Sequence, residues 1–344
     1  MAEVETPDAL RDELRRAWHR YVDMLVPLRP ALYGYCRRLA GSVWDAEDLV
    51  QDTLVRAFGH LGLINHQVRN PRAYLLRTAT NVWIDELRRR ETEARAPMAN
   101  PDAAPATGAD PGASSEVREA GARLLQRLSP QERAAVVLKE LFDLSLEEIA
   151  ELLATTPGAV KAALHRGRAR LREAEGAPAS RRPAPSPELV DRFIERWNAK
   201  DLKGLTELML DGGSVENVGQ ALQLGRETFA RTERNILYHL VHGHTEWPPE
   251  FRPDAVRVER ALFEGEPILL WLVMRRGREA LEVVFRLEEQ EGRIARLRSY
   301  AFSPETMRAV GETLGLRVRT GLYRAPTPAP GAYWPAPTAS PARG

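Results

Sequence analysis

Between Leu128 and Arg172, apolar residues recur at three- and four-residue intervals, which is the period of helices with one buried face. Capping residues divide this stretch, because a side-chain oxygen can accept a hydrogen bond from a free amide at a helix start. The predicted helix starts are Ser129 with Glu132, Ser145 with Glu148, and Thr156 followed by Pro157. A turn at 154–156 joins the last two helices, so the pattern predicts a helix-turn-helix.

The last of these helices is basic on the face that its apolar residues leave exposed. Five Lys or Arg residues and no acidic residue lie between Lys161 and Arg172. This charge suits DNA phosphates and base edges in a major groove. A solvated basic face on an ordinary helical hairpin is the alternative interpretation.

More helices are predicted before residue 96. Segments 8–25 and 31–41 have helical apolar spacing and are separated by Pro27 and Pro30. A further helix, starting at about Asp45, separates its two faces sharply. Its apolar positions are Ala46, Leu49, Val50, Leu54, Ala57 and Phe58, and its opposite positions are Glu47, Asp48, Gln51 and Asp52. Acidic residues also favour a helix N-terminus, so capping chemistry alone is an alternative explanation.

Segment 70–90 predicts another helix, with aromatic and amide side chains followed by three arginines at 88–90. Planar rings can stack on unpaired bases, and arginines can bind the phosphates of a single strand. The arginines would equally suit the C-terminus of an ordinary helix.

These motifs, in this order, resemble a bacterial extracytoplasmic-function sigma factor over residues 20–175. EDLVQDTLVRAF and YLLRTATNVWIDELRRR correspond to region 2, and the helix-turn-helix corresponds to region 4. The resemblance implies a non-catalytic subunit that brings core RNA polymerase to promoter DNA and melts it.

The resemblance also implies roles for individual residues. Those implied to bind the β′ clamp helices of polymerase are Asp45, Glu47, Asp48, Gln51 and Asp52. Those implied to lie near the melted minus-ten element are Asn81, Trp83, Asp85, Arg88 and Arg89. Those implied to face the minus-thirty-five element are Thr156, Gly158, Lys161, His165, Arg166 and Arg168. Region 4 would also contact the β flap. Ala163 stands where many relatives have an arginine, so promoter preference does not transfer.

The C-terminal part has a different pattern. Residues 188–209 read as two amphipathic helices, and segments 254–263, 266–276, 278–289 and 292–300 have strand character. In the third of these segments, Leu281, Val283, Phe285 and Leu287 alternate with polar residues. Gly277 and the 289–292 stretch supply hairpin turns, and a helix follows from Ser303. Helices followed by an antiparallel meander predict a two-layer α+β domain.

FIERWNAKDLKGLTEL and GRIARLRSYAFSPETM resemble the SnoaL-like branch of the nuclear-transport-factor-two superfamily, which implies a curved sheet folded over helices around a pocket. LDGGSVENVG also resembles the glycine-containing stretch of SnoaL-like domains appended to sigma factors. Ser214 and Val215 replace the expected Gly-Lys there, so no contact by that lysine is inferred. His239, His242, His244 and Asp254 could act as ligands or acid–base groups, but a helix end followed by WPPE lacks rigid ligand geometry. We expect surface or core histidines, no metal and no cofactor.

The predicted boundaries are sigma region 2 at 8–95, a linker at 96–115, region 4 at 116–175, a Pro-rich linker at 176–187, the SnoaL-like domain at 188–322 and a disordered tail at 323–344. The first linker reaches roughly 65 Å at about 3.3 Å per residue. Two promoter elements two duplex turns apart are separated by roughly 70 Å, so the linker suffices once the domains cover part of that distance.

Composition limits the kinds of site and the cellular compartment that the chain can be expected to have. The net charge of +1 hides the acidic and basic segments, because they cancel. The single cysteine, Cys36, excludes an internal disulfide and a cysteine-based zinc site. No cationic segment followed by an apolar run opens the sequence, so we expect a cytoplasmic protein with no membrane partner.

The sequence therefore predicts a multidomain sigma factor, with two all-α sigma domains and a C-terminal α+β SnoaL-like cone. The cone would regulate the sigma domains by intramolecular contact. Two alternatives stay open: a bifunctional protein whose cone is an active cyclase or isomerase, and a helix-turn-helix repressor that acts without polymerase.

Overall fold

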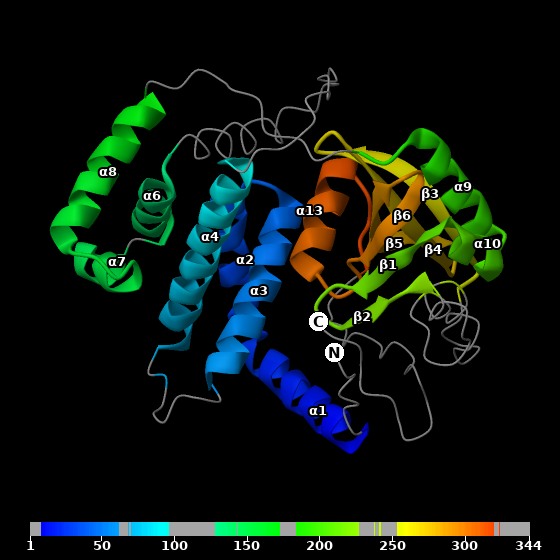
Figure 1. Ribbon diagram of the computed structural model, residues 1–344, viewed down its shortest axis with the longest axis horizontal. Helices are drawn as coiled ribbons and strands as arrows, with labels where there is room; N and C mark the ends of the chain where they lie inside the picture. Colours follow the sequence, from blue (N-terminus) through cyan, green and yellow to red (C-terminus); the bar gives the residue numbers. More distant parts are fainter. Residues whose placement is uncertain are drawn as a thin grey trace. The chain divides into compact units, whose positions relative to one another are not determined.

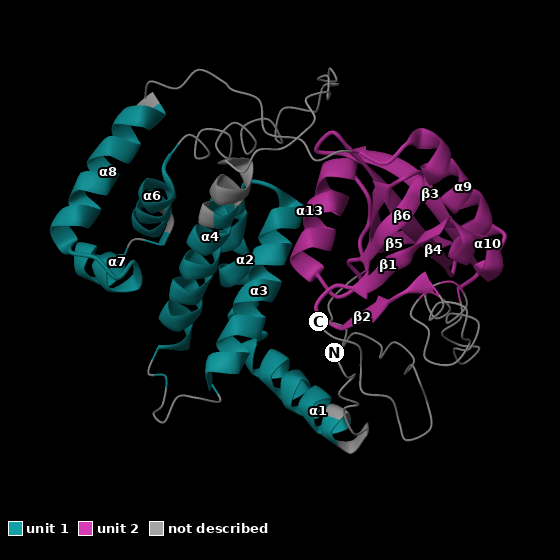
Figure 2. Ribbon diagram, in the orientation of Figure 1, with its two compact units in different colours: residues 1–180 teal, residues 181–344 magenta. Residues whose placement is uncertain are grey.

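The computed structural model divides into two compact units, unit 1 at residues 1–180 and unit 2 at residues 181–344 (Figure 2). The structure describes residues 8–61, 68, 70–95, 128–142, 144–172, 184–226, 237, 241, 253–319 and 323. The predicted linker at 96–115, the tail after residue 323 and the histidines at 239, 242 and 244 lie outside the described residues.

Unit 1 is helical throughout its described part (Figure 1). Its first group of helices is α1 (Asp8–Leu25), α2 (Arg29–Ala40), α3 (Val43–Leu61) and α4 (Pro71–Arg95). Its second group is α6 (Pro130–Phe142), α7 (Leu146–Leu152) and α8 (Pro157–Arg172). The predicted helices are confirmed, with a helix-turn-helix formed by α7 and α8.

The predicted caps hold the helix starts of the second group. The Ser129 amide donates to the Glu132 carboxylate at 3.0 Å, and the Ser145 amide donates to the Glu148 carboxylate at 2.7 Å. In both pairs the serine hydroxyl accepts a hydrogen bond from the glutamate amide in return, which completes a capping box. The Thr156 hydroxyl accepts from an amide in the first turn of α8 at 3.2 Å. Local hydrogen bonds thus divide this segment into three helices.

Helix α3 begins two residues earlier than the predicted start at Asp45. The Ser42 hydroxyl accepts a hydrogen bond from the Asp45 amide at 2.9 Å and donates to the Asp45 carboxylate at 2.8 Å. Ser42 is therefore the capping residue, and Asp45 lies inside the first turn. Gly41, with φ of 87°, follows the last residue of α2 and ends that helix.

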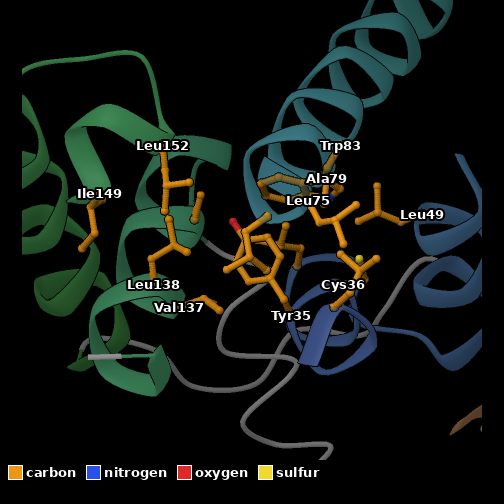
Figure 3. Packing of buried hydrophobic residues seen from close by; sticks show 14 of the residues in the cluster. Tyr35, Cys36, Leu49, Leu75, Ala79, Trp83, Val137, Leu138, Ile149 and Leu152 are labelled. Atoms are coloured by element: carbon orange, nitrogen blue, oxygen red, sulfur yellow. The ribbon is translucent and has the colours of Figure 1, made fainter. Parts of the chain in front are cut away.

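The two helical groups of unit 1 share one hydrophobic core. Figure 3 shows Tyr35 of α2 and Leu75 of α4 facing Leu138 of α6 and side chains of α7. The rings of Tyr35 and Phe142 meet edge to face with centroids 5.7 Å apart. Amphipathic spacing predicted each buried face but not that these faces bury one another.

Unit 2 combines helices with one sheet. Its described elements are α9 (Pro187–Asn198), α10 (Leu202–Leu208), β1 (Met209–Asn217), β2 (Ala221–Leu224), β3 (Ala255–Phe263), β4 (Glu266–Arg275), β5 (Arg278–Gln290), β6 (Arg293–Ser299) and α13 (Pro304–Leu314). The strand order is β2-β1-β6-β5-β4-β3. The predicted α+β class and the four predicted strands are confirmed, and strands β1 and β2 were missed.

Tight turns explain the meander from β3 to β6. Each of its three connections places two consecutive residues at positive φ: Glu264 and Gly265, Arg276 and Gly277, and Glu291 and Gly292. Two positive φ values in a two-residue loop are the requirement of a type I′ hairpin turn, and glycine adopts them without steric cost. Each turn therefore directs the next strand back antiparallel to the previous one.

Strand β1 lies parallel to β6, with an irregular register between Met209 and Ser214. A Cβ added at Gly213 would lie 2.9 Å from the carbonyl oxygen of Leu210, so the backbone there approaches itself too closely for a side chain. Val215 is completely buried in the core. The position that resembles a functional lysine site in related domains is thus a core position in this chain.

The sheet of unit 2 has helices on both faces, with α9 and α10 on one side and α13 on the other (Figure 1). Trp197 of α9 packs against Phe285 of β5 with ring centroids 4.8 Å apart, and Trp271 of β4 stacks on Phe285 at 6.3 Å. Met307 and Val310 of α13 are completely buried. Aromatic side chains therefore fill much of the space between α9 and the sheet.

Candidate protein and nucleic-acid interfaces

The acidic residues of α3 are accessible to solvent to different degrees. Asp52 is exposed, and Asp45, Asp48 and Gln51 are half-buried. These residues fall within about a third of the helix circumference, because successive residues rotate by about 100°. The structure thus presents four of the five residues implied to bind polymerase on one side of α3.

Glu47, the fifth residue, lies inside unit 1 rather than on the acidic surface. Its carboxylate has 0% exposure and pairs with Arg29 of α2 at 2.5 Å. The Gln51 side-chain amide donates to the same carboxylate at 2.6 Å. Helical spacing alone had put Glu47 with the solvent-facing acids. The carboxylate is buried because a cation 18 residues earlier comes into contact with it.

Val55 is an apolar member of the acidic face that the sequence analysis missed. It is 60% exposed and lies three residues after Asp52 and seven after Asp48, so all three share one side of α3. Val55 falls outside the apolar set of the helix, so the helical period alone assigned it no role. An exposed valine among acids could contribute apolar area to a protein interface.

On α4, the residues implied to act near the minus-ten element divide between two sides. Asn81, Asp85 and Arg89 are exposed. Asp85 pairs with Arg56 of α3 at 3.0 Å, and Arg89 pairs with Glu86 at 2.9 Å. The side chain of Arg88 lies outside the described residues.

Trp83 faces the interior, unlike Asn81. It is 5% exposed, and the guanidinium carbon of Arg133 lies 5.0 Å from the centroid of its ring. Two residues along an α-helix are separated by about 200°, so Asn81 and Trp83 necessarily point to nearly opposite sides. The structure does not bring these two implied DNA-binding residues together.

On α8, Gly158, Lys161 and His165 lie exposed along one side of the recognition helix. A Cβ added at Gly158 would meet no atom closer than 4.0 Å, so the backbone is open to an approaching ligand there. The Thr156 hydroxyl caps the helix. Ala163 is 6% exposed, so it packs in the core rather than on this surface.

The arginines of α8 contact carboxylates of α6. Arg166 pairs with Glu132 at 3.0 Å, Arg170 pairs with Glu132 at 2.5 Å, and Arg168 pairs with Glu140 at 2.5 Å. The side chain of Glu132 is only 3% exposed. Arg166 and Arg168 therefore hold α8 against α6, besides any contact they make with a ligand.

Glu132 is ionised in this setting. Burial favours the neutral acid, but hydrogen bonds from the Ser129 amide and from Arg166 outweigh it and hold the pKa of Glu132 below its usual value. Helix α8 also packs closely on α6, since a Cβ added at Gly167 would lie 2.9 Å from Val136. A buried charge and a close helix contact together fix the orientation of α8.

Two family models match unit 1 in order. Sigma-70 region 2 matches residues 24–93, and Sigma-70 region 4 matches residues 119–171. The RNA polymerase sigma-E factor of Streptomyces avermitilis is 35% identical over 144 residues, which cover 42% of this chain and 78% of that protein. The chain belongs to the extracytoplasmic-function sigma factors. Region 2 therefore comprises α2, α3, α4 and the end of α1, and region 4 comprises α6, α7 and α8.

Other sigma factors match different lengths of the chain. The sigma factor SigG of Mycobacterium tuberculosis is 33% identical over 212 residues, covering 53% of this chain and 57% of its own length. The chain thus spans little more than half of that relative. The probable sigma factor SigI of the same species is 27% identical over 318 residues, covering 88% of this chain and 98% of its own length. Similarity to SigI therefore extends into unit 2.

None of the helices formed by the described residues is both long and apolar enough to cross a bilayer. Within the same residues, no three His, Cys, Asp or Glu side chains gather as a metal site. Asp254, considered with the histidines, is exposed and accepts a hydrogen bond from the Gly277 amide at 3.4 Å.

Proposed function

We propose that the chain is a sigma subunit that directs core RNA polymerase to specific promoters in the cytoplasm and initiates transcription there. The observation that carries this proposal is the ordered match of regions 2 and 4 to helices that expose an acidic face on α3 and a basic face on α8. A repressor would need the helix-turn-helix but has no use for the region 2 match.

The acidic surface would bind protein, and the exposed sides of α4 and α8 would bind DNA. The acidic face of α3, formed by Asp45, Asp48, Gln51 and Asp52 with Val55, would bind the β′ clamp helices. The exposed side of α4, with Asn81 and Asp85, would lie near the minus-ten element, and the exposed side of α8 would read the minus-thirty-five element. Region 4 would also contact the β flap.

Run-off transcription tests this function. Purified full-length chain is combined with a bacterial core polymerase, and bound fragments are selected from a random duplex library to find the promoter. The expected result is a discrete transcript that requires the chain, the core enzyme and the selected sequence. Selection of duplexes by the chain alone, with no transcript and no binding to core enzyme, would support the repressor instead.

Replacing Lys161 by alanine is expected to weaken binding to the selected upstream duplex by about 1–3 kcal/mol if the amine reads a base edge. Arg166→Ala should instead lower the thermal stability of region 4, because Arg166 pairs with buried Glu132. Fluorescence anisotropy at two salt concentrations and circular dichroism separate the two effects. Arg16→Ala, at an exposed position of α1, is the matched control. If the Lys161→Ala variant binds the duplex with wild-type affinity, Lys161 is not part of the DNA interface.

We further propose that unit 2 is not catalytic and acts by contacting the sigma domains. Aromatic rings occupy the inner side of its sheet, with Trp197 and Phe285 at 4.8 Å. Glu305, the most buried acid in the described part of unit 2, accepts a hydrogen bond from the Tyr323 hydroxyl at 2.6 Å. Two partly shielded acids are paired with arginines. Glu266 pairs with Arg286 at 2.6 Å, and Glu216 pairs with Arg298 at 3.0 Å. A carboxylate whose oxygens are bound by a guanidinium is less available to exchange a proton with a substrate, which supports a regulatory role over a cyclase or isomerase.

Deleting residues 181–344 is expected to change run-off yield severalfold. The connecting Pro-rich segment is short, so unit 2 meets the sigma domains at an effective concentration of roughly millimolar, where even a weak interface is occupied. The yield rises if unit 2 covers regions 2 and 4, and it falls if unit 2 pre-organises them. Yields equal to those of the full chain at every concentration, without binding of unit 2 added in trans, would contradict the regulatory role.

A further inference from the structure

The two edges of the unit 2 sheet differ in their surroundings. Strand β3 forms one edge, and the side-chain amide of Asn198, at the end of α9, bonds to its backbone. The Asn198 nitrogen donates to the carbonyl oxygen of Val258 at 2.9 Å, and the Asn198 oxygen accepts from the Val258 amide at 2.8 Å. Strand β2 forms the other edge and carries two exposed leucines, Leu222 at 57% and Leu224 at 61%. A side chain thus covers part of the β3 edge, whereas the β2 edge presents apolar side chains.

The two leucines of β2 lie on the same face of the sheet, because alternate residues of a strand point the same way. Leu222 is opposite Glu216 of β1, and Leu224 is opposite Ser214. Both cross-strand neighbours are polar, so β1 gives the leucines little apolar contact. Covering both side chains would remove apolar area from water, which is favourable. Exposed apolar side chains on a sheet edge also favour association between chains, which proteins commonly prevent by covering the edge.

The segment after α13 runs across the sheet to this edge. Leu281 of β5 donates through its amide to the 317–319 segment at 2.8 Å and accepts from it through its carbonyl oxygen at 2.9 Å. Tyr323 then lies beside the turn between β1 and β2, where the Gln220 side chain donates to its carbonyl oxygen at 3.1 Å. The Tyr323 hydroxyl donates to Glu305 of α13 at 2.6 Å. Since β6 and β1 lie between β5 and β2, the segment passes from the middle of the sheet to its β2 edge.

The C-terminal segment, residues 324–344, therefore starts next to the first residue of β2. Its only aromatic residues are Tyr333 and Trp334. Alternating prolines favour an extended chain of about 3.1 Å per residue, so residues 324–330 span roughly 22 Å. The Pro-Gly pair at 330–331 is typical of a type II turn, which reverses the chain.

These lengths match the position of the leucines. Leu224 lies roughly 14 Å along the strand from Gln220, at about 3.4 Å per residue. After a reversal at 330–331, the next three residues bring the chain back by roughly 10 Å. The aromatic pair then comes to the level of Leu224.

We propose that Tyr333 and Trp334 dock on Leu222 and Leu224, so that the chain's own C-terminal segment covers the β2 edge of unit 2. Aromatic rings bury a large apolar area per side chain. The prolines restrict the undocked segment, which lowers the conformational entropy lost on docking. Prolines also flank the aromatic pair and have no amide proton, so a further strand would pair poorly beyond the docked segment. This contact lies within unit 2 and does not depend on polymerase or promoter binding.

Hydrogen exchange of the full-length chain, followed by mass spectrometry of a peptide covering residues 209–225, measures opening of the β1–β2 hairpin. The variant Tyr333→Ala with Trp334→Ala should exchange about tenfold faster in this peptide, because the lost apolar contact lowers the free energy of opening. The matched control, Thr327→Ala with Thr338→Ala, changes two residues of the same segment that are not aromatic. It should exchange at the wild-type rate.

Two further measurements show whether the aromatic pair acts through the leucines. Leu222→Ser with Leu224→Ser should accelerate exchange by itself, and combining it with the aromatic variant should add nothing, because both remove the same contact. Leu262→Ser changes a leucine of β3 that is 54% exposed, and it should leave the tenfold effect of the aromatic variant intact. A synthetic peptide of residues 329–338 should restore slow exchange to the aromatic variant but not to the β2 leucine variant.

Each other result would overturn the docking of the C-terminal segment. Exchange that does not depend on the aromatic pair, or effects that add fully to those of the leucine variant, would show that the pair lies elsewhere. Protection that falls on dilution, with sedimentation as a dimer, would assign the β2 edge to a second copy of the chain. Protection that arises only after core polymerase is added would assign it to polymerase. If the leucine variant does not fold, rescue of the aromatic variant by the peptide supports docking, and failure of rescue refutes it.

Discussion

Replacing Glu47 by alanine is expected to destabilise region 2 by about 3–5 kcal/mol. The carboxylate is fully buried and pairs with Arg29, whose side chain is only 4% exposed. Removing one partner of a buried ion pair leaves the other charge without compensation. Hydrogen exchange of α2 and α3 amides in the full-length chain should show the loss as faster exchange in both helices.

A matched comparison shows whether burial causes the effect. Asp52→Ala changes an exposed acid on the same helix and should shift stability by no more than about 0.5 kcal/mol. The double change of Arg29 to Met with Glu47 to Leu removes both charges and should recover much of the lost stability. Equal exchange rates in Glu47→Ala and Asp52→Ala would show that the pair contributes nothing to the fold.

Local features of this fold could be predicted from the sequence. The helix starts at Ser129, Ser145 and Thr156 depend on hydrogen bonds that span three residues, and the structure contains all three. The meander from β3 to β6 depends on two-residue turns with glycine at positive φ, which also act locally. Spacing and turn chemistry suffice where a structure is determined by neighbours in the chain.

Features that depend on distant partners could not be predicted. Strand β1 pairs in parallel with β6, about 80 residues later, and its glycines accommodate a register irregularity instead of a turn. Glu47 was assigned to the surface because helical spacing does not reveal Arg29. The contact of Arg133 with Leu39 joins residues 94 positions apart. In each case a tertiary partner decides where the side chain lies, and spacing along one helix carries no information about it.

Spacing along one helix was also insufficient to identify which residues of α3 and α4 can meet a partner. The pattern of α3 identified the side that carries Asp48 and Asp52 but gave Val55 no role, because an isolated valine among polar residues has no periodic signal. The family resemblance grouped Trp83 with Asn81, although the helical period places them on nearly opposite sides. Burial in the structure now separates residues that can meet a partner from residues that hold the domain together.

Reversing Asp48 and Asp52 to lysine is expected to abolish binding to core polymerase, with a loss of at least about 30-fold in affinity. The two acids share one side of α3 with Val55, which is 60% exposed, so this surface combines negative charge with apolar area. Like charges placed together in an interface cost several kcal/mol and slow association as well. Neither side chain is fully buried, so the stability of unit 1 should change by no more than about 0.5 kcal/mol per residue.

Binding measured by surface plasmon resonance against immobilised core enzyme tests this surface. The matched control reverses two exposed acids elsewhere, Asp12 and Glu13 of α1, and alters the net charge by the same amount. A loss confined to the α3 variant identifies a specific surface, whereas equal losses would reveal only long-range charge attraction, which weakens with added salt. Val55→Ser should weaken binding by faster dissociation at unchanged charge, because apolar contact acts after encounter. Normal binding of the α3 double variant would show that polymerase docks elsewhere, and the buried ion pair of Glu47 would then be the main role of this acidic helix.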